Sequence, residues 1–438
     1  MLIILLIGSL TALLPDQEIL NEKMIRENAV NLPYGVLPLF KEKDGVSVGL
    51  YSIADTVRWT QLSTTVKYQK GGMGFIAAPI LRYGEAHLYP TRKKINLHAD
   101  IIRGSIFYRN DNLIFSAGKD IFKIGGALEY NPTLSPNLPL NYARFIYSGD
   151  KFSFSHLISR LDDYKGVEFE WADTSTGTIN NLHRYLGIHR LEFKPANWIC
   201  ISFTEAMLIG GETLGFPFEL LSPITIYYLE QYNQKENVNI LWNMDVAAIW
   251  KNFLFYTDFF IDDFQYEPDP WKEPNLIGLL ASVEGIDLKK KGTEFILSYN
   301  FMSRWPYCNI RVWQRYQDKG FPLGSQLGND YDRLLIKALY PISSFKTGFE
   351  ISFTRRGENS IDTPWPVNPK IAVTPYNQFK GSNFLSGMVE KRLSISSITR
   401  YKSLITVTMG FYWLQNYKHR EGDTKIAPLL HIKFNYSL

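Results

Sequence analysis

The side chains best suited to chemistry in this 438-residue chain lie in the connections between alternating, strand-like segments. Carboxylate, amide and guanidinium groups can hydrogen-bond sugar hydroxyls, and aromatic rings can stack on the flat C–H face of a sugar. Each residue also has an alternative explanation. An aromatic ring could belong to the aromatic belt at the membrane interface, and an arginine could balance the charge of a carboxylate in the lumen. Their clustering in the same connections favours carbohydrate recognition. The candidate polysaccharide-binding residues are Asp262, Asp263, Gln265, Tyr266, Trp271, Arg304, Trp305, Tyr307, Arg355, Arg356 and Trp365.

The aspartates near residue 260 could also form the carboxylate pair of a glycosidase, but polar lining of a lumen explains them better. Adjacent strand residues point to opposite faces, so Asp262 and Asp263 require that the strand end or bulge at that point. We expect one of these carboxylates to pair with a lumen arginine and the other to bind loop backbone near 320–324. The predicted lumen charge network comprises Asp258, Arg311, Arg315 and Arg333.

Other chemistries find no support in the residue pattern. His183 and His189 share one strand face but stand roughly 20 Å apart along it, too far to ligate one metal ion. The glycines of 71–74 link two strand-like segments, without the helix that a phosphate loop needs. The motifs of serine hydrolases and zinc proteases are missing from the sequence. We therefore predict no catalytic residue, no metal site and no cofactor.

The alternating residues at the C-terminus indicate that the strands of a β-barrel position these residues. Residues 430–438 alternate strictly, and the polar set is His431, Lys433, Asn435 and Ser437. A strand with one apolar and one polar face at the very end suits a closed transmembrane barrel, whose last strand must pair with its first. The alternative is the last strand of a soluble sandwich. In a barrel the residues facing lipid are Leu430, Ile432, Phe434, Tyr436 and Leu438.

The same period of two recurs along the chain, most clearly at 293–302, 309–316, 349–356 and 405–413. Strands of about ten residues cross a bilayer when tilted, and the chain has room for roughly 16–20 of them. The long connections should lie outside the cell and carry the function. They fall near 125–140, 209–224, 264–274, 317–330 and 357–381.

Composition agrees with a membrane barrel. Aromatic residues make up 15% of the chain, including 26 tyrosines, as aromatic girdles require. The longest apolar run is too short for a transmembrane helix. The net charge of +4 is spread without blocks, which argues against nucleic-acid binding.

Three regions follow from this reading. Residues 1–14 contain an apolar run of the length of a signal-peptide core and are predicted to be an export signal. A buried helix is the alternative for this run. Residues 15–45 form a polar, partly helical N-terminal segment, and residues 46–438 form the outer-membrane barrel.

Four short stretches, in order along 113–335, resemble the capsule assembly Wzi family of outer-membrane proteins. The first joins 116–119, 124–126 and 134–137, with Lys119 where the family has arginine and Ile124 where it has tryptophan. The others are His189–Pro195 with Ser202–Glu205, Tyr256–Gln265, and Gly320–Gly324 with Gly328–Asp330.

The resemblance implies a monomeric, all-β protein of the bacterial outer membrane, with 18 antiparallel strands and a short N-terminal helical segment. It implies a lectin for capsular or related surface polysaccharide, with that glycan and outer-membrane lipid as its partners. A porin-like channel for small solutes and an outer-membrane enzyme modifying glycan or lipid are the alternatives. An open lumen would favour the channel, and a lumen filled by loops would favour the lectin.

Overall fold

The computed structural model describes most of the chain. The described residues are 24–27, 36–37, 45–55, 59–84, 96–126, 131–136, 138–163, 167–170, 176–179, 182–212, 214–233, 238–264, 274–288, 290–309, 311–363, 384–402 and 404–437. The proposed export signal lies outside them.

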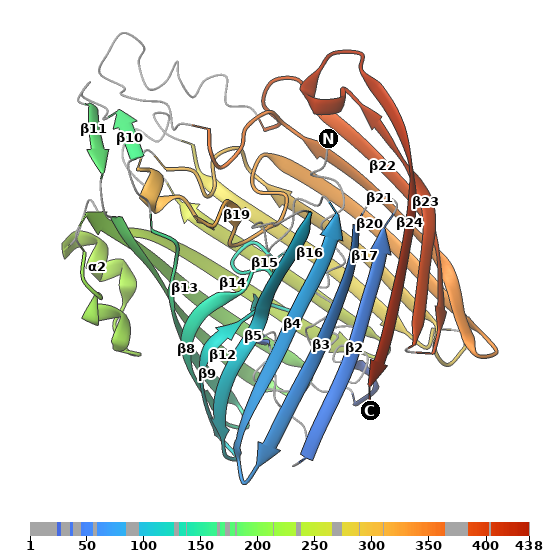
Figure 1. The fold of residues 1–438 in the computed structure, drawn as a ribbon, viewed down its shortest axis with the longest axis horizontal. Helices are drawn as coiled ribbons and strands as arrows, with labels where there is room; N and C mark the ends of the chain where they lie inside the picture. Colours follow the sequence, from blue (N-terminus) through green and yellow to red (C-terminus); the bar gives the residue numbers. More distant parts are fainter. Residues whose placement is uncertain are drawn as a thin grey trace.

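Long antiparallel strands form a barrel (Figure 1). In order around the sheet they are β2 (Gly45–Asp55), β3 (Trp59–Lys70), β4 (Met73–Gly84), β5 (Leu97–Arg109), β6 (Leu113–Asp120), β8 (Leu140–Ser148), β9 (Phe152–Arg160), β12 (Leu182–Ala196), β13 (Ile199–Glu212), β14 (Val238–Trp250), β15 (Phe253–Asp263), β16 (Leu276–Ile286), β17 (Glu294–Met302), β20 (Tyr331–Ile342), β21 (Phe345–Arg356), β22 (Glu390–Tyr401), β23 (Ile405–Gln415) and β24 (Thr424–Ser437). The ladder returns on itself, because β2 pairs with both β3 and β24.

Shorter elements lie in the connections. Three small two-stranded antiparallel sheets pair β1 (Val36–Leu37) with β7 (Lys123–Ile124), β10 (Val167–Glu170) with β11 (Thr176–Ile179), and β18 (Gln317–Asp318) with β19 (Phe321–Pro322). The helical pieces are η2 (Phe218–Leu221), α2 (Tyr227–Asn233), η3 (Val312–Gln314) and η4 (Tyr417–His419). Within the described residues, no helix is both long and apolar enough to cross a membrane.

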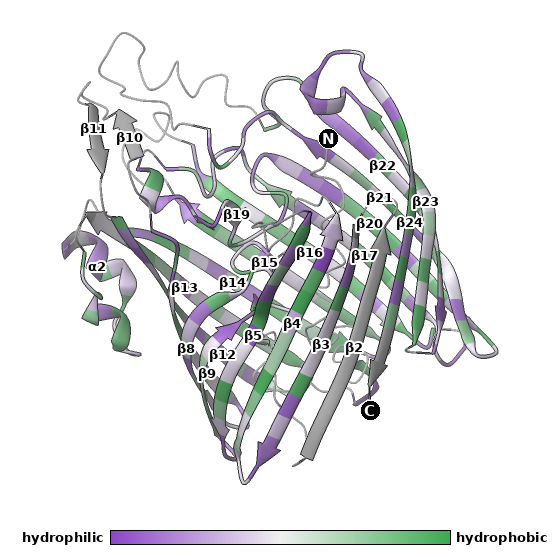
Figure 2. Ribbon diagram, in the orientation of Figure 1, coloured by the Kyte–Doolittle hydropathy of each residue, from purple (hydrophilic) through white to green (hydrophobic). Residues whose placement is uncertain are grey.

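Alternation along each strand separates the outer wall from the lumen. In β15, Phe255 and Phe259 are exposed, whereas Tyr256 and Asp258 between them are buried. Figure 2 shows the resulting change of hydropathy from residue to residue along the strands. The exposed rings face the surroundings of the barrel, as expected of a wall in contact with lipid.

Tight turns join the strands at one end of the barrel and long connections join most of them at the other (Figure 1). The turn between β3 and β4 consists of Gly71 and Gly72, whose φ angles of 56° and 83° suit a two-residue hairpin with both residues left-handed. The C-terminus lies at the same end as these turns. Outer-membrane barrels place such short turns on the periplasmic side.

The predicted all-β fold is confirmed, and the alternating segments at 293–302, 349–356, 405–413 and 430–437 lie in β17, β21, β23 and β24. In β24, Ile432 is exposed, in agreement with its predicted lipid-facing position. The strand predicted at 309–316 is wrong. This stretch contains η3 and lies in a connection, where Trp313 and Tyr316 are buried. Its side chains are not buried in alternation, since the adjacent Trp313 and Gln314 are both buried, so the apolar residues of this stretch pack as a loop and not as a strand.

Phe259 on the outer wall provides a test of this arrangement. Phe259→Arg should lower the free energy of unfolding of the vesicle-embedded protein by about 2–4 kcal/mol, because it moves a charge into hydrocarbon near the bilayer centre. Phe264→Arg, which changes an exposed ring just beyond the end of β15, should cost only about 0–1 kcal/mol. Urea titration of vesicle-bound protein measures both values. Equal costs for the two variants would contradict this placement of β15 in the membrane.

Candidate functional site

Two long connections fill the barrel mouth instead of extending away from it. Their described parts are residues 121–126 and 131–136, which follow β6, and residues 303–309 and 311–330, which lie between β17 and β20. Together they are called the plug below, and β19 of the plug lies within the mouth in Figure 1. They share one buried apolar cluster with the lumen side of the wall. The plug contributes Ile121, Phe122, Ile124, Leu134, Tyr307, Tyr316, Phe321, Leu323 and Leu327 to this cluster, and the wall contributes residues such as Leu186, Ile188, Leu241 and Phe260.

Hydrogen bonds join the two halves of the plug. The Tyr307 hydroxyl donates to the carbonyl of Pro132, and the Tyr316 hydroxyl donates to the carbonyl of Thr133 at 2.9 Å. The N–H of Ser135 donates to the carbonyl of Leu323, also at 2.9 Å. Burial raises the pKa of the Tyr316 hydroxyl above its ordinary value, so the phenol remains a neutral donor.

Asp258 fixes the first half of the plug to the wall. Its carboxylate accepts from Asn131 Nδ2 at 2.9 Å and from the Tyr256 hydroxyl at 3.0 Å, and it also accepts from Asn243. Gly125 approaches the same point with a φ of 86°, and a side chain there would overlap Tyr256 and Asn131. The lumen role predicted for Asp258 is supported, but these partners are amides and a phenol.

A buried ion cluster in the neighbouring strands surrounds Arg190. The guanidinium donates to Glu192 at 2.8 Å, to Thr204 at 3.0 Å and to both oxygens of Asp245 at 2.5 and 3.1 Å. All four side chains are buried. Charged groups removed from water need such partners, so this cluster is an intact, fixed part of the wall.

Asp262 holds the second half of the plug. The register of β15 shifts between Ile261 and Asp263, so the predicted bulge is present and Asp262 is buried while Asp263 is exposed. The Asp262 carboxylate accepts the N–H of Tyr307 at 2.5 Å. The loop backbone that it binds is therefore at residue 307 and not at 320–324.

Arg184 of β12 is a further attachment point for the plug. This fully buried guanidinium donates to the carbonyls of Trp313, Arg315 and Gln317 at 2.9, 2.7 and 2.9 Å. It also donates to Asp162 Oδ1 at 2.7 Å. One side chain of the wall therefore satisfies several carbonyls of a loop that has little secondary structure of its own.

Asp162 lies beside a second carboxylate at this point. Its N–H donates to Asp318 Oδ1 at 2.7 Å, and Lys319 Nζ donates to the other oxygen of Asp318 at 2.9 Å. Burial and the nearby Asp318 raise the pKa of Asp162 to about 6, although Arg184 acts in the opposite direction.

A third connection, after β21, is tied to the plug through Asp330. The carboxylate of Asp330 accepts from the Ser386 hydroxyl at 2.5 Å and from the N–H of Asn359 at 3.3 Å. The Asn359 amide in turn donates to the carbonyl of Arg304 at 2.7 Å. These bonds link residues 357–363 and 384–387 to residues 303–330.

The structure separates the candidate polysaccharide-binding residues into three groups. Trp305 and Tyr307 are 4% and 0% exposed, and their rings pack between the plug and the wall, beside Leu276 and Phe260 respectively. Arg304 Cζ lies 4.7 Å from the centroid of the Trp305 ring. Arg355 is 42% exposed at its side chain and makes a forked ion pair with Asp332, with one N–O distance of 3.0 Å, and Arg356 beside it is half-buried. Gln265, Tyr266, Trp271 and Trp365 lie outside the described residues.

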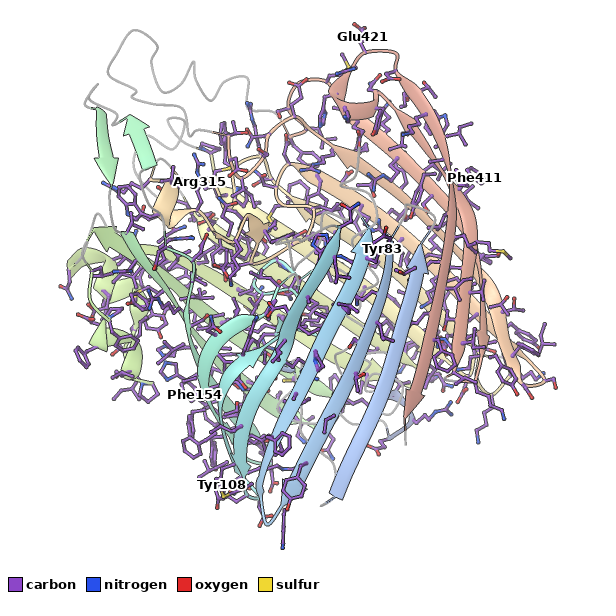
Figure 3. All side chains as sticks on the ribbon, in the orientation of Figure 1. Tyr83, Tyr108, Phe154, Arg315, Phe411 and Glu421 are labelled. Carbon is purple, nitrogen blue, oxygen red and sulfur yellow. The ribbon has the colours of Figure 1, made fainter. Side chains whose placement is uncertain are left out.

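The arginines of the predicted charge network lie in two places: Arg311 and Arg315 flank η3 in the plug, and Arg333 lies in β20 of the wall. Arg315, labelled in Figure 3, lies 3.7 Å from Asp362 and takes part in the plug through its backbone carbonyl. Arg333 belongs to β20, where Nη1 donates to Thr354 at 3.4 Å.

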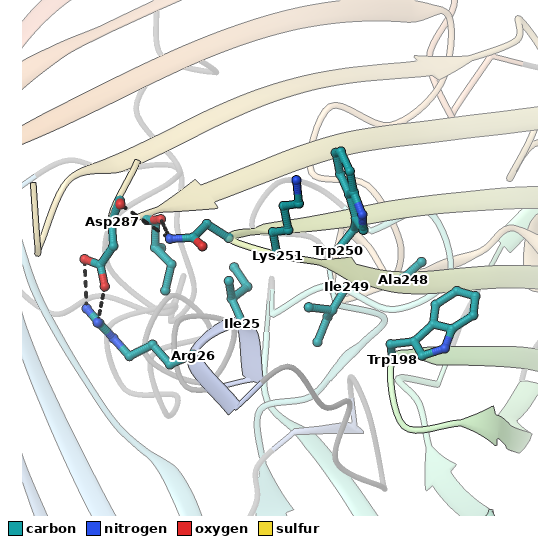
Figure 4. Close-up of a pocket in the computed structure, with 10 residues that line it drawn as sticks. Ile25, Arg26, Trp198, Ala248, Ile249, Trp250, Lys251 and Asp287 are labelled. Carbon is teal, nitrogen blue, oxygen red and sulfur yellow. Dashed lines mark hydrogen bonds and ion pairs between the residues drawn. The ribbon is translucent and has the colours of Figure 1, made fainter. Parts of the chain in front are cut away.

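At the opposite end, the helical turn at 24–27 enters the barrel. Met24 and Ile25 share a buried cluster with wall residues such as Ile249 and Leu254, and Arg26 pairs with Asp287. A 900 Å³ cavity between this turn and the strand ends is lined in part by Trp198, Trp250 and Lys251 (Figure 4). The described part of the predicted N-terminal segment is thus helical where it touches the wall.

Comparison with known proteins shows the fold class of this chain. No protein-family model matches the chain, and no curated protein matches it. Solved structures of outer-membrane β-barrels do match, and this is the fold class of the chain. This fold places the protein in the bacterial outer membrane, as predicted.

One similar structure is that of Wzi of Escherichia coli, which is described as a carbohydrate-binding β-barrel involved in group 1 capsule assembly. The present chain superposes on it with a TM-score of 0.62 and 11% sequence identity. The superposition covers 96% of this chain and 97% of Wzi. The predicted Wzi-like fold is therefore confirmed. OccD3 and OprD of Pseudomonas aeruginosa each superpose with a TM-score of 0.45 over 94% of this chain. OccD3 is 11% identical and 95% of it is covered, and OprD is 10% identical and 99% of it is covered.

Arg184→Met tests the attachment of the plug. Loss of these bonds leaves buried carbonyls and Asp162 without their donor, which should cost about 3 kcal/mol locally. Amide exchange at residues 311–319 should therefore become roughly 100-fold faster in hydrogen-exchange mass spectrometry. Arg160→Met is the matched control, because that side chain is 55% exposed at the end of β9. Unchanged protection of 311–319 in Arg184→Met would disprove this role.

Asp162 should make the same loop sensitive to pH. The pKa of Asp162 is about 6 in the ordered loop and 3.8, its ordinary value, in the opened loop. Between these two pH values the ordered loop keeps a proton that the opened loop releases. Loop stability should therefore fall as pH rises from about 4 to about 6 and stay low above that. Exchange at 311–319, corrected for intrinsic rates, should show more protection at pH 5 than at pH 7. Asp162→Asn should remove the difference, and a variant that retains it would exclude Asp162 as the source.

Proposed function

We propose that this protein is a closed, 18-stranded outer-membrane barrel that binds exported capsular or related surface polysaccharide and helps to attach it at the cell surface. The filled mouth carries this proposal. A channel for small solutes needs a continuous lumen, whereas the described loops of this barrel bury a shared apolar cluster within it. The Wzi-like fold and the four matching stretches of sequence support the same function.

The proposal assigns two roles to the candidate residues. Trp305, Tyr307 and Asp262 fix the loops, since they are buried and their contacts lie within the plug or between it and the strands β15 and β16. Arg355 is proposed to contact the glycan, because its guanidinium is held by Asp332 and remains partly exposed. A fixed, planar donor can hydrogen-bond adjacent sugar hydroxyls at little entropic cost. Gln265, Tyr266, Trp271 and Trp365 remain predicted ligands from their residue types.

An enzymatic role is not part of the proposal. Three carboxylates could serve a glycosidase: Asp258, Asp262 and Asp263. Asp258 and Asp262 are buried and accept hydrogen bonds from the plug, so Asp263 is the one of the three that is exposed, whereas a glycosidase needs a pair. A catalytic carboxylate must reach the glycosidic bond. In the described residues Asp258 and Asp262 have structural partners, which supports a binding protein.

Binding of purified capsular polysaccharide from the host strain to immobilised protein tests the proposal. Arg355→Lys keeps the charge but loses the forked geometry, and we expect it to weaken binding about tenfold. Trp271→Ala should weaken binding by a similar factor through loss of stacking. Trp250→Ala, at the opposite rim, should have no effect.

Conductance in planar bilayers distinguishes the channel alternative. The wild-type protein should be nearly closed under conditions in which a porin conducts. A large, stable conductance together with unmeasurable polysaccharide binding would establish the channel and disprove the proposed lectin.

A further inference from the structure

A groove of 820 Å³ runs across the outer wall of the barrel, away from the plug. Its floor contains Ala117 of β6 and Ala143 of β8, which pair directly across the two strands. Both are exposed, and the next residues along the same cross-strand row are Ile106 and Ile158. Two small residues between two large ones leave a hollow at this point of the wall.

This hollow lies on the lipid side of the wall. Ile106 is 68% exposed, whereas Ser116 and Arg144, which alternate with the two alanines, are buried toward the lumen. A row of aromatic rings borders the hollow, with Phe115 and Phe145 at a centroid distance of 5.1 Å. The groove is thus apolar, and it opens toward the hydrocarbon of the membrane.

One side of the groove is formed by a segment that folds over the outside of the barrel. η2 and α2, between β13 and β14, lie against the outer wall in Figure 1. The Tyr227 ring stacks on His189 at 4.1 Å, and Glu205 accepts the N–H of Tyr227 at 2.8 Å. These contacts hold η2 in place, so that exposed Leu221 lines the groove.

The other end of the groove carries a positive charge near the membrane surface. Lys70 is the last residue of β3, next to the Gly71–Gly72 turn at the periplasmic rim, and its exposed side chain lines the groove. Tyr68 and Tyr108 also line this end, where amphipathic rings suit an interface. In Figure 3, Tyr108 lies near the lower rim of the wall and Phe154 lies higher.

We propose that this groove holds one phospholipid of the periplasmic leaflet, with an acyl chain over Ala117 and Ala143 and its anionic phosphate beside Lys70. From β3 to β8 the groove crosses four strand spacings, roughly 19 Å. Because the strands of such barrels tilt by about 40°, this length corresponds to roughly 12 Å along the membrane normal, within the roughly 15 Å depth of one leaflet. An acyl chain that follows the groove therefore stays within one leaflet. The site is separate from the plug and does not depend on polysaccharide binding.

Native mass spectrometry of the full chain tests this site, with palmitoyl-oleoyl phosphatidylglycerol as the probe. The wild-type protein should retain one lipid at collision energies that remove the others. The double variant Ala117→Phe/Ala143→Phe should lower this retained fraction at least tenfold, because the rings occupy the hollow. Ala281→Phe is the matched control, since Ala281 is an exposed residue of β16 that does not line the groove. If the double variant does not fold, the milder Ala117→Leu/Ala143→Leu pair replaces it.

The headgroup contact is tested separately with Lys70→Gln. This variant should bind phosphatidylglycerol about fivefold more weakly and should lose its preference over phosphatidylcholine of the same chains. Lys251→Gln, at the rim beside Trp250, should leave both lipids unaffected. Undiminished retention in the groove-filling variant, or an unchanged lipid preference in Lys70→Gln, would overturn the proposal. A dimer that buries Ala143 in lipid nanodiscs would also overturn it.

Discussion

Backbone hydrogen bonding is the constraint on which the rest of this structure depends. In hydrocarbon an unpaired N–H or carbonyl has no water to bind, so a membrane sheet cannot leave an edge strand exposed. Here β24 pairs with β2, and the first and last long strands no longer present edges. A sheet of this many strands encloses far more space than the wall side chains can fill. The plug occupies that space, and its anchors are polar side chains on the lumen side of the strands.

These anchors explain why the lumen wall is rich in charge although its mouth is filled. The plug has little regular secondary structure, so its backbone carbonyls need donors from elsewhere. Arg184 supplies several of them, and Asp258 and Asp262 accept from Asn131 and from the backbone of Tyr307. Removing one partner would leave the other buried and unsatisfied, which costs more than the bond itself contributes. The anchors therefore specify one loop arrangement as well as stabilise it.

Sequence reasoning predicted the wall better than the plug. The strands β17 and β24 were evident because a lipid face and a lumen face alternate residue by residue, which is a local rule. The bulge at Asp262 followed from the same rule, since adjacent carboxylates cannot share a face. Its bond to Tyr307 joins residues 45 positions apart, and no local pattern encodes such a partner. Asn131 binds Asp258 from 127 positions away, which no local pattern encodes either. The alternation around Val312 predicted a strand, although that stretch is a loop with buried side chains.

The long sequence separation of the plug contacts has a consequence for the order of folding. Tyr307 and Pro132 are 175 residues apart, and Tyr316 and Thr133 are 183 apart. Such contacts cannot form until the strands between them have been placed, because the entropy of closing so long a loop must be offset first. The wall should therefore assemble before its contents, and for part of its assembly the barrel is a wide, water-filled ring. Loss of a plug contact should then mainly accelerate unfolding and leave the rate of wall formation almost unchanged.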